Sequence, residues 1–198
     1  MKRFSISFSA IAVAFLLVFS TSQAPAQSIG NTISGIANFV AGKIKVTQAQ
    51  IIGTWKYSSP GCAFTSESFF AEAGGSVAAA EVKDRLKEYY AMVGVNSSNT
   101  TFTFTADNKF KANIDGFPWS GTYKYDPKTG AIKLKSLLMT STAYITRTTK
   151  GISLNFESQK LLTILQSAAA LSGDSKIQTL GKLSKNYKGL RVGFELKK

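Results

Sequence analysis

The residue types that carry most enzyme chemistry are scarce in this chain of 198 residues. It has no histidine, a single cysteine and 11 acidic residues. Without histidine, a Ser-His-Asp triad, a Cys-His pair and a His-ligated zinc site are all excluded. The acidic residues are spread too thinly to favour the carboxylate pair of a glycosidase. We therefore expect no catalytic residue, no metal site and no cofactor, and predict that the protein is not an enzyme.

Two segments come closest to a nucleophile site. Gly74-Gly75-Ser76 resembles a nucleophile turn, but no base is available to activate the serine, and we interpret it as a break between helices. Cys62 follows Pro60-Gly61 in a segment with turn composition. We interpret Cys62 as a small, partly buried hydrophobic residue, because no histidine is present to lower its pKa.

Residues 1–26 have the order of a secretory signal peptide. Lys2 and Arg3 precede an apolar run over 6–19, and the small-residue segment Ala24-Pro25-Ala26 follows. The run is short for a bilayer crossing, which takes ~20 residues. We predict cleavage before Gln27 and export to the periplasm or the exterior. The mature chain would then be an N-terminal arm or helix over 27–46 and one domain over 47–198.

The charge of the chain bears on its partners. The net charge is +13, and it falls to +11 when Lys2 and Arg3 leave with the signal peptide. An exported protein of this charge favours anionic partners such as acidic glycans, lipid headgroups or small carboxylates, and we expect no nucleic acid. The alternative is a solvated lysine coat that protects sheet edges from aggregation. The sequence leaves the oligomeric state open.

Most of the chain after Gly53 alternates apolar and polar residues, which is typical of strands with one buried face. Segments with turn composition separate the strands, among them Ser58-Ser59-Pro60-Gly61, Ala106-Asp107-Asn108 and the corner Gly116-Phe117-Pro118-Trp119. Eight strands are predicted, at about 51–57, 101–105, 109–115, 122–125, 131–135, 142–148, 152–156 and 190–196.

Two helical insertions interrupt the strands. The first covers 65–93, is broken at Gly74-Gly75, and carries an apolar stripe of Val82, Leu86, Tyr89, Tyr90 and Val93. The second precedes the last strand, with one helix beginning near Leu161 and another over about 175–187. The prediction is a mainly β fold, an eight-stranded antiparallel up-and-down barrel with helical insertions after the first strand and before the last. A curved half-barrel with a helix across its open face is the alternative.

An eight-stranded barrel is wide enough either to be filled by side chains or to hold one small ligand. The predicted inner wall supplies the candidate ligand-binding residues Tyr57, Phe102, Phe104, Phe110, Tyr123, Tyr125, Leu134 and Phe156. Tyrosine hydroxyls need partners in a dry core, which favours a partly polar pocket around Tyr57, Tyr123 and Tyr125. One hypothesis is therefore a non-catalytic exported binding protein that holds a small amphiphilic or hydrophobic molecule, anionic in view of the charge.

The other hypothesis is a cell-envelope interaction or structural protein with a filled barrel. Its function would then lie on the basic outer surface, at Lys56, Lys109, Lys111, Lys124, Lys133 and Lys135.

The segment Gly53-Thr54-Trp55 resembles the opening Gly-x-Trp strand of the lipocalins and of the wider calycin group. Phe102 to Phe110 and Gly121-Thr122-Tyr123 continue the likeness. Over about 47–198, the order of strands and helices resembles a family of exported lipocalin-like proteins of gut bacteria. The resemblance implies that Gly53 and Trp55 are structural and that Trp55 plugs the closed end of the barrel.

In lipocalins a basic residue near the last strand packs over this tryptophan. Arg191 is the candidate for that role here, although the alternation places it on the outer face. The helical insertions exceed the lipocalin pattern, which leaves open whether they close the mouth of the barrel or pack outside it.

Overall fold

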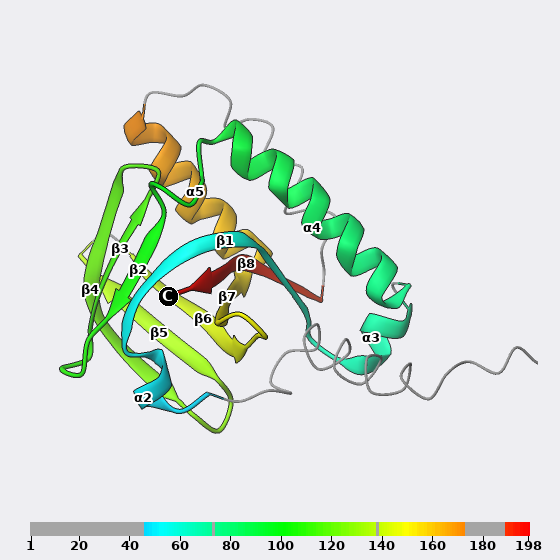
Figure 1. Ribbon diagram of the computed structural model, residues 1–198, viewed down its shortest axis with the longest axis horizontal. Helices are drawn as coiled ribbons and strands as arrows, with labels where there is room; N and C mark the ends of the chain where they lie inside the picture. The colour runs from blue at the N-terminus through cyan, green and yellow to red at the C-terminus, as the bar shows by residue number, and fades with distance from the viewer. Residues whose placement is uncertain (1–45, 73, 138, 173–188) are drawn as a thin grey trace, which may run out of the picture.

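The structure is a computed structural model that describes residues 46–72, 74–137, 139–172 and 189–198 (Figure 1). The described residues form eight antiparallel strands in sequence order, and the last pairs with the first to close a barrel. The strands are β1 (Gly53–Phe64), β2 (Thr101–Phe104), β3 (Lys109–Ile114), β4 (Phe117–Asp126), β5 (Ala131–Ser136), β6 (Thr140–Arg147), β7 (Ile152–Glu157) and β8 (Leu190–Lys197). The predicted barrel is confirmed, and the half-barrel is excluded. The predicted signal peptide, almost all of the N-terminal arm and the helix over 175–187 lie outside the described residues.

Alternation produces the barrel wall. Along β3 the odd-numbered residues are exposed and the even-numbered ones are buried, and β5 follows the same rule, whereas along β4 the odd-numbered residues are the buried ones, apart from the half-buried Gly121. Each strand therefore turns one apolar row inward, and the burial of each large apolar side chain contributes about 1.5–3 kcal/mol. Closure removes the unpaired edges that a flat sheet of these strands would leave.

The first strand runs further than predicted. Ser58-Ser59-Pro60-Gly61 is not a turn, because β1 continues through it to Phe64, with a register shift between Tyr57 and Ser59. Pairing of β1 with β2 covers Gly53–Lys56, so Pro60 lies in a stretch paired with β8 alone. Proline is tolerated at such an edge.

The predicted corner at Gly116-Phe117-Pro118-Trp119 is also wrong. The turn is made by Asp115-Gly116, and β4 begins at Phe117. Pro118 lies in β4 opposite Asn113 with its ring exposed, while Phe117 and Trp119 face inward.

Helices close one end of the barrel. The predicted insertions are α3 (Glu67–Glu72) and α4 (Gly75–Met92) after the first strand, and α5 (Ser158–Ser172) before the last. Helix α5 contacts β4 as well as β7 and β8. Since β4 and β8 lie on opposite sides of an eight-stranded barrel, a helix that contacts both must cross its mouth (Figure 1). No helix among the described residues has the length and apolar character to span a membrane.

Helix α4 packs over the inner face of the β1 and β8 extensions. Its predicted apolar stripe is confirmed, since Val82, Leu86, Tyr90 and Val93 are buried and Tyr89 is partly buried. The ring of Tyr90 stacks on Phe194 with centroids 5.4 Å apart. Its hydroxyl donates to the carbonyl of Gly193 at 2.8 Å. The helices therefore seal the mouth with side chains that join the barrel core.

Candidate functional site

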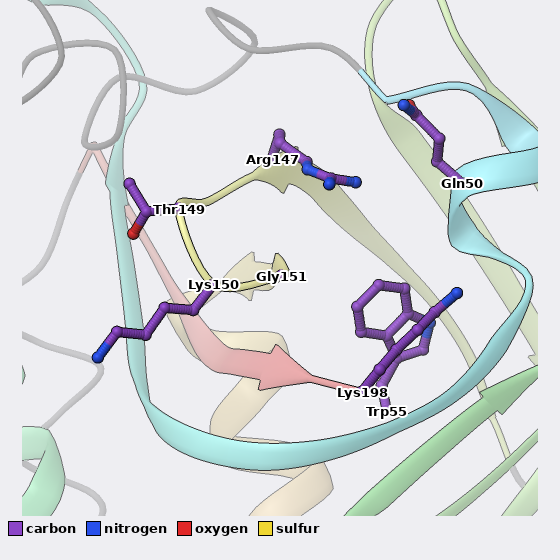
Figure 2. Close-up of a pocket in the computed structure, with 7 residues that line it drawn as sticks. All are labelled: Gln50, Trp55, Arg147, Thr149, Lys150, Gly151 and Lys198. Atoms are coloured by element: carbon purple, nitrogen blue, oxygen red, sulfur yellow. The ribbon is translucent and has the colours of Figure 1, made fainter.

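A pocket of about 430 Å³ lies at the end of the barrel opposite the helical lid (Figure 2). We call it the Trp55 pocket. Its walls come from the short helix α2 (Gln48–Ile51), the start of β1, the end of β6, the β6–β7 turn and the C-terminal residue. The lining residues are Gln50, Trp55, Arg147, Thr149, Lys150, Gly151 and Lys198.

Trp55 forms the floor of this pocket. Its side chain is only 3% exposed, and its indole N–H donates to the carbonyl oxygen of Ile51 at 2.7 Å. Gly53 has φ +129, a conformation that L side chains rarely adopt. A Cβ at Gly53 would also lie 3.2 Å from Cε of Lys198. The Gly-x-Trp segment therefore combines a backbone bend with a fixed aromatic face.

The side chains that line the Trp55 pocket include three cations and no anion. The ammonium of Lys198 lies 5.0 Å from the centroid of the Trp55 ring, within the range of a cation–π interaction. Figure 2 shows the guanidinium of Arg147 extended into the space between Gln50 and Trp55, while Lys150 points away. Within the described chain, none of these three cations forms an ion pair. Their combined field therefore favours a negatively charged group at the pocket.

The prediction that Arg191 packs over Trp55 is wrong, because Lys198 occupies that position. Arg191 lies on the outer face, where its guanidinium carbon is 3.3 Å from the centroid of the Tyr144 ring. Burial lowers the pKa of the Arg191 guanidinium from its ordinary value. Arg191 thus holds β8 against β6 across β7 and takes no part in the Trp55 pocket.

The eight predicted ligand-binding residues all lie on the inner wall, as their alternation indicates. Six of them, Phe102, Phe104, Phe110, Tyr123, Leu134 and Phe156, have 0–4% of their surface exposed. A side chain that bordered a water-sized void would keep accessible surface there. These six therefore pack against their neighbours, and the structure brings none of the eight into the Trp55 pocket.

Ring contacts show how the interior is filled. Phe194 lies at the centre of a cluster, with ring centroids 5.3 Å from Phe102 and 6.5 Å from Phe156. Trp119, which the sequence analysis placed at a corner, lies 5.1 Å from Phe110 and continues the cluster. Edge-to-face and tilted arrangements of this kind favour a solid aromatic core.

The tyrosine hydroxyls of the inner wall find backbone partners at the Trp55 end. Tyr123 donates to the carbonyl of Thr105 at 2.9 Å, and Tyr125 donates to that of Val46 at 2.6 Å. Burial raises the pKa of both phenols, and burial followed by the charge of Glu195 raises that of Tyr57. The hydroxyls of Tyr123 and Tyr125 therefore do not need a polar pocket.

Two buried polar atoms on the inner wall have no hydrogen-bond partner, the indole nitrogen of Trp119 and the hydroxyl of Ser141. Unpaired buried polar groups are uncommon in folded proteins, and an interior ligand would have these two atoms to bind. The ligand role of the eight inner residues stays a prediction.

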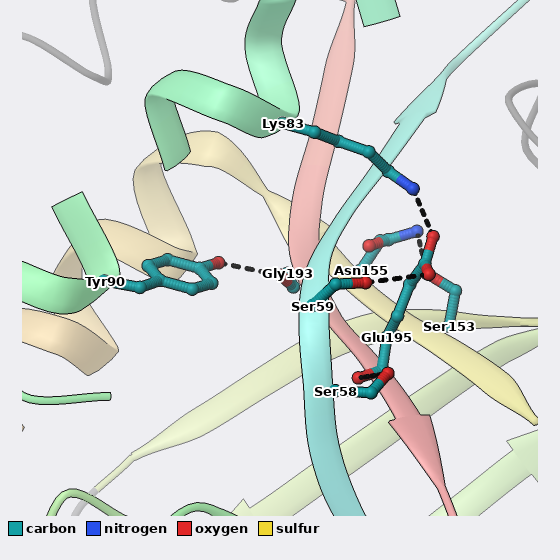
Figure 3. A network of polar contacts seen from close by, with 8 residues as sticks. All are labelled: Ser58, Ser59, Lys83, Tyr90, Ser153, Asn155, Gly193 and Glu195. Carbon is teal, nitrogen blue, oxygen red and sulfur yellow. Dashed lines mark hydrogen bonds and ion pairs between the residues drawn. The ribbon is translucent and has the colours of Figure 1, made fainter. Parts of the chain in front are cut away.

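A second hollow, of about 490 Å³, lies between α4 and β1 and includes Tyr57 and Lys83. Here Lys83 forms an ion pair with Glu195, whose other carboxylate oxygen accepts from the hydroxyl of Ser59 at 2.9 Å (Figure 3). The bonds join α4 to β8 and β1 to β8. Since Glu195 neutralises the charge of Lys83, we interpret this hollow as part of the packing between α4 and the sheet, and not as a ligand site.

The sequence-based candidates for reactive chemistry have no reactive setting. Cys62 is 3% exposed, and burial raises the pKa of its thiol to about 12. The interpretation of Cys62 as a hydrophobic residue is confirmed, and it lies in a strand rather than in a turn. In the parts of the chain that the structure describes, no three His, Cys, Asp or Glu residues gather as a metal site would need.

Sequence reasoning missed the cations of the Trp55 pocket. Arg147 ends β6, Lys150 lies in the β6–β7 turn and Lys198 ends the chain, so no local spacing links the three. Only barrel closure brings these segments beside Trp55. In the sequence, the Gly-x-Trp segment is the feature that points to the Trp55 end of the barrel.

A family model described as a lipocalin-like domain matches residues 27–198. No curated protein and no solved structure matches the chain significantly. The family match covers all eight strands, the helical lid and the Trp55 pocket.

Proposed function

This chain belongs to the lipocalin-like domain family, and on that premise we propose that it is a non-catalytic binding protein for a small anionic molecule. The ligand would bind in the Trp55 pocket, at the end of the barrel opposite the helical lid. The observation that carries the proposal is a pair of cations, Arg147 and Lys198, beside one fixed aromatic ring, with no ion pair to either within the described chain.

The chemistry of the Trp55 pocket limits the ligand class. A guanidinium such as that of Arg147 binds a carboxylate or a phosphate in bidentate fashion, and the ammonium of Lys198 adds a point charge. The small exposed part of Trp55 adds an apolar contact beside these charges. A volume of about 430 Å³ lies within the range of small-molecule sites. An amphiphile with one acidic group fits these features.

We further propose that binding takes place outside the cytoplasm. The signal-peptide pattern of residues 1–26 supports this location. The family match begins at Gln27, the residue predicted to start the mature chain, which also supports it.

Thermal unfolding of the mature protein with inorganic phosphate, small carboxylates and acidic amphiphiles tests the binding proposal. A ligand at about 100 times its Kd should stabilise the fold by about 2.7 kcal/mol. We expect the double variant R147Q/K198Q to lose this stabilisation. The variant K87Q/K160Q removes two exposed charges from helices α4 and α5 and should keep it. The proposal would be contradicted if no anion of the panel stabilised the wild-type protein. It would also be contradicted if an anion stabilised R147Q/K198Q as much as the wild type.

A further inference from the structure

We propose that the barrel also docks on the surface of an anionic lipid bilayer, through the outer face of β3, β4 and β5 and the turn that follows β5. This surface is separate from the Trp55 pocket and goes beyond anion binding there. Five exposed lysines make up what we call the lysine face, Lys109, Lys111, Lys124, Lys133 and Lys135.

Strand register concentrates the charge of the lysine face. Lys124 lies directly opposite Lys133 across β4 and β5, and Thr122 lies between Lys109 and Lys135. Like charges directly opposite each other destabilise a sheet, so folding does not account for this pair. Lys109 forms an ion pair with Asp107. Elsewhere on this face, among described residues, no carboxylate lies within ion-pair distance of a lysine.

An apolar tip adjoins the lysine face. Leu137 follows β5 two residues after Lys135, and its side chain is fully exposed. The turn is closed by the amide of Ser136, which donates to the carbonyl of Met139 at 3.0 Å. Turn positions are dominated by glycine, proline, asparagine, aspartate and serine, so Leu137 serves neither turn geometry nor solubility.

A residue that breaks a local folding rule without structural compensation points to a function. The lysines alone would suit any polyanion, including a soluble acidic polysaccharide. The exposed leucine distinguishes between these partners, because a bilayer offers both negative headgroups and an apolar layer into which Leu137 can insert. The combination therefore favours a lipid surface.

The expected loss of vesicle affinity in each variant follows from what each replaced side chain contributes to membrane binding. A lysine near an anionic membrane contributes about 1 kcal/mol, which corresponds to about a fivefold change in affinity. The variant K124Q/K133Q should therefore bind about thirtyfold more weakly, and its barrel should stay folded because a repulsive pair is removed. Leu137→Asn removes the apolar side chain and should weaken binding about tenfold or more. Asparagine is a favoured turn residue, so this substitution suits the turn.

Co-sedimentation with vesicles tests the proposal. The mature protein should bind vesicles of phosphatidylcholine mixed with phosphatidylglycerol, in a salt-sensitive manner, and should not bind phosphatidylcholine alone. K87Q/K160Q removes the same charge from the helices and should bind like the wild type, as should R147Q/K198Q. Failure to bind the mixed vesicles would overturn the proposal. So would binding that L137N leaves unchanged, and a preference for heparin that L137N does not alter would assign the lysine face to a polysaccharide.

Discussion

Trp55 is the residue on which the candidate site depends. Its ring is buried at one end of the barrel, held by the carbonyl of Ile51 and covered by Lys198. The same ring thus closes the core on one side and forms a pocket floor on the other. Stability and ligand binding should therefore both respond to its removal.

Replacement of Trp55 by alanine is expected to lower the free energy of unfolding by about 3–5 kcal/mol, as other large core truncations do. Urea denaturation measures this loss. Lys198→Gln removes only the exposed cation above the ring and should cost much less. A loss below about 1 kcal/mol for Trp55→Ala would show that the ring is not part of the core.

Cys62 should be inert in the folded protein. With its pKa raised to about 12 by burial, the thiol stays protonated at pH 8, where only about one molecule in ten thousand carries a thiolate. We expect no labelling by iodoacetamide under native conditions and full labelling in denaturant. Rapid native labelling at pH 8 would contradict the burial of Cys62.

The helices α4 and α5 act as the lid of the barrel. Residues of α4 contact inward-facing rings of β1 and β8, and α5 reaches across to β4. A lid held by core side chains differs from a loop that opens for ligand entry. Access to the interior from this end would require the separation of packed aromatic rings.

The bond from Tyr90 to the carbonyl of Gly193 offers a test of the lid. Tyr90→Phe leaves a buried acceptor without its donor and should cost about 1–2 kcal/mol in urea denaturation. Tyr89→Phe is the matched control, because Tyr89 lies at the partly buried edge of the same stripe, and it should change stability by less than about 0.5 kcal/mol. Equal effects of the two substitutions would mean that α4 is not anchored through Tyr90.

For the whole molecule, alternation was enough to predict the barrel. Phe102 and Phe104 between threonines, and Phe110 between lysines, locate strands and faces without tertiary information. The Ser59-Pro60-Gly61 segment was read wrongly because its composition favours a turn. Glycine is needed there for another reason, since a Cβ on Gly61 would overlap the side-chain oxygen of Asn155 on β7.

The candidate site was less predictable than the barrel. Arg147 and Lys198 are far apart in the sequence. Arg147 is the last residue of β6 and Lys198 follows β8, so the register of both strands had to be known before the two could be placed together. The alternation did identify the inner wall, but it could not determine whether large side chains leave room between them. That depends on ring contacts such as those of Phe156 with Trp119 and with Phe194, which form only in three dimensions.

The central claim is that a small anion binds in the Trp55 pocket of a barrel with a filled interior. Native mass spectrometry of the protein purified from its own host tests it most directly. We predict an added mass on the wild-type protein that K87Q/K160Q retains and R147Q/K198Q loses. A wild-type protein that carries no ligand would contradict the claim, and so would a ligand retained by R147Q/K198Q, which would locate binding among the inner-wall residues instead.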